Sequence, residues 1–260
     1  MRTIANNISS KKVKVARALS QGDADFIREM ARQCLSAGAD VLDINLQHGL
    51  DRPRTMEVAV QAAQEAGDAQ LCLSSNNVLA LEAGLRKCRR SALVNYVSLE
   101  EDRVQKILPV AAKYGAGVVL LPSGSSPATG AEEVIRAASI LVGAANELGI
   151  TNDRILIDPG VFHITALEGQ HHAQVLMELL PALTSAFDPG VEITCWVENI
   201  SSGIPARLRP PLNRAFFMML AGLGLSSVFV DILDRDTRRT MRLAKILKGE
   251  LVYSDRDIEL

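Results

Sequence analysis

Aspartate and asparagine recur at one place in this sequence, the carboxyl end of short apolar runs. Polar side chains close such runs at Asp43 and Asn45, Ser74, Asn95, Asp158, Asn199 and Asp231. A short apolar run bounded by polar residues is typical of a buried β-strand. The carboxyl ends of parallel strands converge on one mouth of a barrel. The pattern therefore predicts a single site that is rich in amide and carboxylate groups.

Such groups favour the binding of a flat, polar heterocycle through hydrogen bonds. An ionised carboxylate only accepts hydrogen bonds and can take two N–H donors side by side, whereas an amide offers one donor and one acceptor face. The expected mouth contains Asp43, Asn45, Ser74, Asn95, Asp158 and Asn199. Taken alone, each residue is better explained as a strand end or a helix cap. Six convergent positions together favour a binding site.

Three other chemistries fit the sequence less well. A Schiff-base enzyme needs a lysine inside the barrel, and every lysine falls in a predicted helix or flanking loop. The four histidines lack the spacing of metal ligands, so no bound metal is expected. The end of the eighth strand carries Asp231, Asp234 and Asp236, whose charge would repel a phosphate group.

Eight strand–helix units are expected to position these residues. The strands are predicted at residues 3–8, 40–45, 70–74, 92–96, 117–121, 154–158, 191–197 and 226–231. The helices are predicted at residues 24–37, 53–66, 78–87, 100–114, 131–148, 170–180, 212–223 and 237–248. Alternating strands and helices form a parallel sheet, and eight such units fit a closed (β/α)8 or TIM barrel. We expect one α/β domain over residues 1–260.

Composition narrows the class of protein further. The chain has 260 residues, of which 48% are hydrophobic, and a formal net charge of −2. Nucleic-acid binding is not expected because it needs a basic face, and the basic clusters at 11–14 and 86–90 are interpreted as solvated helix ends or loops. No apolar run reaches the roughly 20 residues that span a bilayer, and no signal peptide is recognised. Four cysteines without CxxC spacing indicate reduced thiols in a cytoplasmic protein.

The sequence resembles the pterin-binding methyltransferases, which exchange a methyl group between tetrahydrofolate and a corrinoid protein such as a corrinoid/iron-sulfur protein. The resemblance covers nearly the whole chain and is carried by residues 38–45 (GADVLDIN), 71–73 (LCL), 82–88 (EAGLRKC), 93–95 (LVN), 157–159 (IDP), 199–201 (NIS) and 211–214 (PLNR). Dihydropteroate synthases and the folate domain of methionine synthase share the barrel that this resemblance implies.

The resemblance also implies roles for individual residues. Asp158 and Asn95 match residues that bind the pterin ring, and Asn199 matches the amide that reaches N5, the reactive nitrogen of the folate. Asp43 and Asn45 match a pair on the second strand. The implied substrate-binding set is Asp43, Asn45, Ser74, Asn95, Asp158, Asn199, Ser201 and Arg209 (or Arg207 in a shifted alignment), with Asn199 also catalytic.

Two positions depart from the family pattern. The family carries Asp where this chain has Ser74, and its opening Gly-Glu-Arg-Ile-Asn motif appears here as residues 5–9, with Asn6 in place of the acidic residue. Replacing a carboxylate by a hydroxyl loses a charge-assisted hydrogen bond worth about 1.5–3 kcal/mol. We expect pterin binding to weaken about ten- to hundredfold unless another group compensates.

The implied activity is methyl transfer between N5 of a folate and the cobalt of a corrinoid protein. Tetrahydrofolate or 5-methyltetrahydrofolate would be the substrate, and a partner protein would supply the cobalamin. A cytoplasmic homodimer is expected. Two alternatives stay open. One is a condensation like that of dihydropteroate synthase, and the other is a homologue that binds a pterin or methyl donor with an altered ligand.

Overall fold

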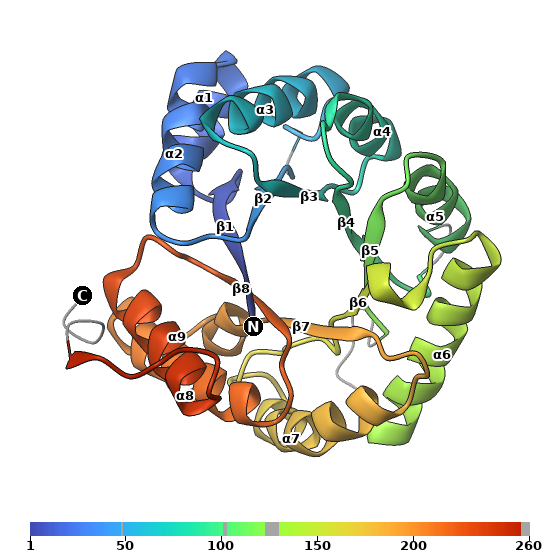
Figure 1. Cartoon of the computed structure of the whole chain (residues 1–260), viewed down its shortest axis with the longest axis vertical. Helices are drawn as coiled ribbons and strands as arrows, with labels where there is room; N and C mark the ends of the chain where they lie inside the picture. Colours follow the sequence, from blue (N-terminus) through green and yellow to red (C-terminus); the bar gives the residue numbers. More distant parts are fainter. Residues whose placement is uncertain (48, 101–102, 123–129, 256–260) are drawn as a thin grey trace.

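The computed structural model contains eight parallel strands that form one closed barrel in chain order (Figure 1). The structure describes residues 1–47, 49–100, 103–122 and 130–255. The strands are β1 (Arg2–Ser9), β2 (Val41–Asn45), β3 (Gln70–Ser74), β4 (Leu93–Val97), β5 (Gly117–Leu120), β6 (Ile155–Ile157), β7 (Glu192–Trp196) and β8 (Ser227–Val230). Pairing of β1 with β8 closes the barrel. The expected (β/α)8 fold is confirmed.

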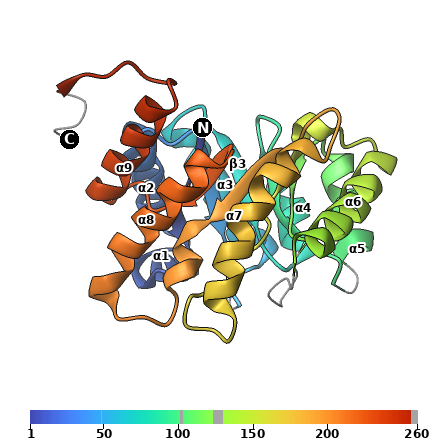
Figure 2. The same ribbon diagram turned by 90° about the horizontal axis from the view of Figure 1, so that it is seen from below.

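Helices surround the barrel, as the two perpendicular views show (Figures 1 and 2). They are α1 (Val13–Gln21), α2 (Ala24–Ser36), α3 (Pro53–Ala66), α4 (Val78–Lys87), α5 (Arg103–Lys113), α6 (Ala131–Glu147), α7 (Gly169–Ser185), α8 (Arg209–Gly222) and α9 (Arg235–Leu247). No helix in the described ranges is long and apolar enough to cross a membrane.

Two helices differ most from the sequence-based prediction, and the bounds of the others agree to within about three residues. Helix α1 is absent from the sequence-based prediction, because its nine residues bury only Val15, Ala18 and Leu19 and the lysines around them fit a solvated helix end or a loop equally well. Helix α7 continues past Leu180 and through Pro181 to Ser185. Its apolar face stays in the core beyond the proline, since Leu183 is fully buried. Tertiary packing therefore overrides the local helix-breaking signal.

The side chains inside the barrel form an apolar layer and, above it, a polar layer. The apolar layer consists of Ile4, Val41, Cys72, Leu93, Val119, Leu156 and Phe229. Residues two apart on a strand face the same side. The positions two residues further along are therefore also directed inward, and six of these seven are polar: Asn6, Asp43, Ser74, Asn95, Asp158 and Asp231. The fold thus places the amides and carboxylates at the mouth.

Candidate active site

A cavity of about 270 Å³ opens at the carboxyl ends of the strands. Its walls include five of the eight predicted binding residues, namely Asn45, Ser74, Asn95, Asp158 and Asn199. The remaining walls are formed by Lys11, Gln47, Ser75, Asn76, Tyr96, Leu121, Gly160, Val161, Phe162 and Trp196. The structure therefore brings together predicted binding residues that are up to 154 positions apart in the chain (Asn45 and Asn199).

The other three predicted binding residues lie outside the cavity walls. Asp43 is completely buried and is linked to the cavity wall by the hydrogen bond that it accepts from Ser74. Ser201 is also buried, and its hydroxyl donates to the carbonyl oxygen of Glu198 at 3.1 Å. Arg209 is exposed at the start of α8, where its Nε donates to the carbonyl oxygen of Ile204 at 2.8 Å. In this conformation neither Ser201 nor Arg209 is directed at the cavity.

Ser74 links three strands through a buried chain of hydrogen bonds. The Asn95 amide nitrogen donates to Ser74 Oγ at 2.8 Å, and Ser74 Oγ donates to Asp43 Oδ1 at 2.5 Å. Burial raises the pKa of Asp43 to about 7, although the hydrogen bond from Ser74 acts in the opposite direction. Ser74 is therefore a structural partner of a buried carboxyl group as well as part of the cavity wall.

We predict that Ser74→Ala lowers the free energy of unfolding by about 1–3 kcal/mol, because buried polar groups lose a partner. The raised pKa of Asp43 means that the fold favours its protonated form, so this group stabilises the fold least above pH 7. The hydrogen bond from the Ser74 hydroxyl stabilises the ionised form of Asp43 more than its protonated form. The destabilisation should therefore be larger at pH 8.5 than at pH 5.5 in urea denaturation, and an equal loss at both pH values would contradict the role assigned to Ser74.

Asp158 provides the carboxylate of the cavity itself. It follows β6, is 6% exposed, and its Oδ1 accepts a hydrogen bond from the Gly160 N–H at 2.9 Å. Burial raises the pKa of Asp158 to about 7, against the effect of backbone hydrogen bonds from Gly160 and Trp196. A ligand that offers N–H donors would favour the ionised form.

Two asparagines offer free hydrogen-bonding groups to a ligand. Asn45 Oδ1 is buried and has no hydrogen-bond partner within the described part of the chain. Asn199 is the exposed residue of the otherwise mostly buried turn Val197–Ser201 after β7, and its side chain forms no hydrogen bond with any described residue. Buried polar groups are normally satisfied, so Asn45 in particular indicates that a ligand or water completes the site.

The sequence did not reveal the aromatic walls or the role of Lys11. Trp196 stacks on Phe229, with 4.6 Å between ring centroids and 14° between planes, and the Arg103 guanidinium lies 4.3 Å from the Tyr96 ring centroid. Strand alternation directs Trp196 inward with Thr194 and could have identified it. Lys11 was interpreted as a solvated loop residue, whereas the structure places it in the cavity wall.

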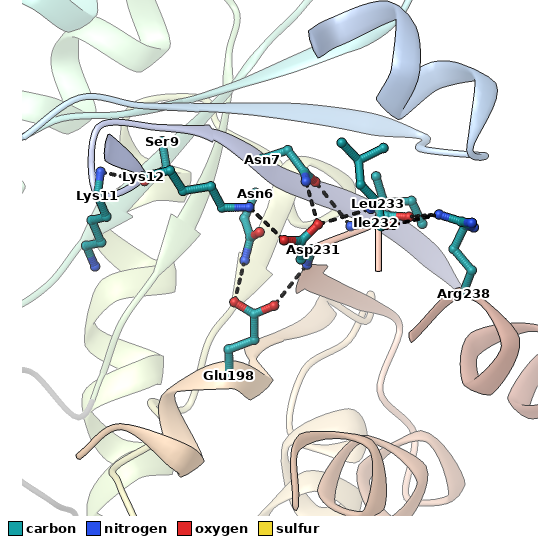
Figure 3. Close-up of polar contacts among 10 residues, drawn as sticks. All are labelled: Asn6, Asn7, Ser9, Lys11, Lys12, Glu198, Asp231, Ile232, Leu233 and Arg238. Carbon is teal, nitrogen blue, oxygen red and sulfur yellow. Dashed lines mark hydrogen bonds and ion pairs between the residues drawn. The ribbon is translucent and has the colours of Figure 1, made fainter. Parts of the chain in front are cut away.

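A second polar network joins the ends of β1 and β8 beside the cavity (Figure 3). Asp231 accepts hydrogen bonds from Lys12 Nζ at 2.8 Å and from Asn7 Nδ2 at 2.5 Å. Burial alone would raise the pKa of Asp231, but Lys12 and Asn7 lower it overall. Asp234 caps α9 by accepting from the Thr237 N–H at 2.7 Å. These carboxylates are engaged, so the end of the eighth strand repels anions less than the sequence suggested.

The described residues contain no group of three His, Cys, Asp or Glu side chains that could hold a metal ion. His48, one of the four histidines, lies outside those residues.

The fold and this cavity define a class: TIM-barrel proteins with an amide- and carboxylate-lined pocket at the carboxyl ends of their strands. Residues 6–231 match the family described as pterin binding enzyme. The chain belongs to this family, as its resemblance to the pterin-binding methyltransferases led us to expect.

Individual relatives agree with this membership. Methylcorrinoid:tetrahydrofolate methyltransferase of Eubacterium limosum is 26% identical over 85% of this chain and 82% of that protein. Methionine synthase of Mycobacterium tuberculosis is also 26% identical over 78% of this chain, but the match spans 18% of that larger protein. Among solved structures, a Yersinia pestis dihydropteroate synthase aligns with a TM-score of 0.73 at 19% identity, covering 96% of this chain and 94% of the other. At that identity the likeness shows the shared fold.

Proposed function

We propose that this protein transfers a methyl group between N5 of tetrahydrofolate and the cobalt of a corrinoid protein. The observation that carries the proposal is the acceptor-lined cavity, with the Asp158 carboxylate beside the amides of Asn45, Asn95 and Asn199, in a pterin-binding barrel. The relative from Eubacterium limosum supports it, because that protein is named for this exchange.

In this proposal the donor edge of the pterin lies on Asp158. An ionised carboxylate accepts two adjacent N–H groups, which a pterin offers along one edge. Asn95 and Asn45 complete the polar contacts, and Trp196 and Phe162 provide apolar walls for the flat ring. Asn199 is then the amide at N5.

The chemistry needs no nucleophile from this chain. In one direction the bond between N5 and the methyl group breaks and its electron pair stays on nitrogen, which takes up a proton, while cobalt(I) supplies the electron pair of the new bond. In the other direction the lone pair of N5 attacks the methyl group of a methyl-cobalt(III) corrinoid, the cobalt–carbon bond breaks with its electron pair left on cobalt(I), and N5 releases its proton. The Asn199 amide can stabilise charge that develops at N5. The corrinoid is a substrate that a partner protein carries.

Two alternatives make different use of the same cavity. A condensation like that of dihydropteroate synthase requires cations for a pyrophosphate leaving group. The Lys12 ammonium beside β8 is already paired with Asp231, which leaves Lys11 as the one positively charged side chain in the described cavity wall. A homologue that only binds a pterin would need no corrinoid.

Spectroscopic assays separate the three functions. We expect the protein to convert 5-methyltetrahydrofolate and cob(I)alamin to methylcobalamin, and methylcobalamin with tetrahydrofolate in reverse, without added metal. Folate binding without methyl transfer would indicate a binding protein. Condensation of a pterin pyrophosphate with p-aminobenzoate would indicate a synthase. Light scattering of the same sample tests the predicted homodimer.

The affinity for tetrahydrofolate is expected to rise with pH through about 7. The pKa of Asp158 is about 7 without ligand, and only the ionised carboxylate accepts both N–H groups. One unit below that pKa about a tenth of the molecules are ionised, so binding at pH 6 should be about tenfold weaker than at pH 8. Calorimetry in buffers of different ionisation enthalpy should detect proton release on binding. Asp158→Asn should remove this pH dependence, and a wild-type affinity that does not change with pH would contradict the assignment.

A further inference from the structure

The turn between β1 and α1 carries two adjacent lysines whose side chains take different directions (Figure 3). Lys12 Nζ forms an ion pair with Asp231 at 2.8 Å, on the side of β8. Lys11 instead lines the cavity, with its ammonium group 5.9 Å from the centroid of the Trp196 ring. Lys12 therefore joins the turn to β8, whereas Lys11 is available to the cavity.

The turn is attached on both sides, which limits where Lys11 can reach. Toward β2, the Ser10 N–H donates to the carbonyl oxygen of Asn45 at 2.9 Å and the Gln47 N–H donates to Ser10 Oγ at 2.9 Å. Toward β8, the ion pair of Lys12 holds the other end. Lys11 thus projects from an ordered turn over the cavity.

No carboxylate of the described residues forms an ion pair with Lys11, although its charge acts at a distance on the buried Asp43 and opposes the rise in the pKa of that group. Among the described cavity walls, Lys11 carries the one positive charge. Lys11 is exposed, whereas Asp158 is 6% exposed, so the cation lies at the rim and the carboxylate on the floor. A ligand with N–H donors at one end and an anionic group at the other would match both.

We infer that Lys11 binds a carboxylate in the tail of a folate and makes the site prefer tailed folates over free pterins. The inference rests on the proposed function. A tetrahydrofolate joins its pterin, through p-aminobenzoate, to a glutamate with two carboxylates. With the pterin edge on Asp158, the tail leaves the cavity at the rim. The phosphate of a corrinoid nucleotide offers similar anionic oxygens, and corrinoids with and without that phosphate distinguish it from the folate tail.

Calorimetry on Lys11→Met tests the inference, with Lys14→Met as a matched control because Lys14 is exposed and does not line the cavity. The ligands are tetrahydrofolate and 6-methyltetrahydropterin, which has no tail. We expect Lys11→Met to weaken the binding of tetrahydrofolate about three- to fivefold, as for the loss of an exposed ion pair. The affinity for the tail-less pterin should not change. The difference in tetrahydrofolate affinity between the wild type and Lys11→Met should become smaller as the salt concentration rises from 50 to 500 mM. Lys14→Met should bind both ligands as the wild type does.

Several results would overturn the inference. Equal weakening of both ligands would assign Lys11 to the pterin ring or to the support of Trp196, and no change in either ligand would remove it from the site. Cobinamide lacks the nucleotide phosphate of cobalamin. If Lys11→Met raises only the KM for cobalamin and leaves the KM for cobinamide unchanged, Lys11 binds the corrinoid and not the folate. A wild-type protein that binds neither ligand would refute the proposed function itself.

Discussion

Asn199→Ala is expected to slow methyl transfer by about 10²–10³-fold while changing the affinity for tetrahydrofolate less than tenfold. A group that acts on charge developing at N5 contributes more in the transition state than in the ground state, and loss of one such donor lowers rates by about this factor. The Asn199 side chain has no hydrogen bond to a described residue, so its removal should leave the fold intact.

Stopped-flow methyl transfer with cob(I)alamin, folate titration and thermal melts of the same variant measure these three quantities. Ser202→Ala is the control, since Ser202 is exposed next to the same turn and does not line the cavity. Equal losses in binding and rate would make Asn199 a simple ligand. A loss of stability with an unchanged rate in the folded fraction would make it a structural residue.

Asp158→Asn is expected to weaken tetrahydrofolate binding about ten- to hundredfold at pH 8, more than Ser74→Ala does. The variant loses a charge-assisted pair of hydrogen bonds, worth about 1.5–3 kcal/mol, and its amide nitrogen can face a ligand donor. The fold should persist, because the new amide oxygen can still accept from the Gly160 N–H, as Asp158 Oδ1 does at 2.9 Å.

Stability measurements separate this loss of affinity from unfolding. The pKa of Asp158 is raised to about 7 by burial, so the folded state disfavours the ionised carboxylate and stability from this group falls as pH rises to about 7. A neutral amide removes that cost, and Asp158→Asn should be at least as stable as the wild type at pH 8. Asp153→Asn, at an exposed position before β6, is the control. If Ser74→Ala reduces affinity more, the pterin does not lie on Asp158.

The two departures from the family pattern have a common structural feature. Where Ser74 replaces the expected carboxylate, Asp43 accepts its hydroxyl hydrogen bond at 2.5 Å. Where Asn6 replaces the acidic residue, its amide donates to Glu198 Oε2 at 3.2 Å, and Glu198 Oε1 accepts from the Asp231 N–H at 3.0 Å (Figure 3). In both cases a carboxylate from another strand or its following turn lies within hydrogen-bond distance of the altered side chain.

The sequence alone determined the barrel and the position of its polar side chains at the mouth. Apolar runs alternating with helical periodicity require a parallel sheet, and the period of two along a strand directs Asp43, Asn95 and Asp158 to the side of Val41, Leu93 and Leu156. Both the periodicity and the direction of a side chain on its strand are local properties, so a single sequence is enough to predict them. Of the five predicted cavity residues, four close an apolar run or lie directly after one, and Asn199 lies one residue further on, after Glu198.

Only the tertiary structure decided how these residues are paired. No local pattern distinguishes Lys11, at the cavity, from Lys12, whose partner Asp231 is 219 positions away. Likewise Ser74 meets Asp43 across 31 positions, and its part in a buried chain was not visible in the sequence. Periodicity specifies which face of a strand a side chain occupies, but strand register and the closure of the barrel specify its neighbours. Charge pairing and burial depend on those neighbours. The ion pairs and pKa shifts of the site are therefore set by the tertiary structure and not by local sequence.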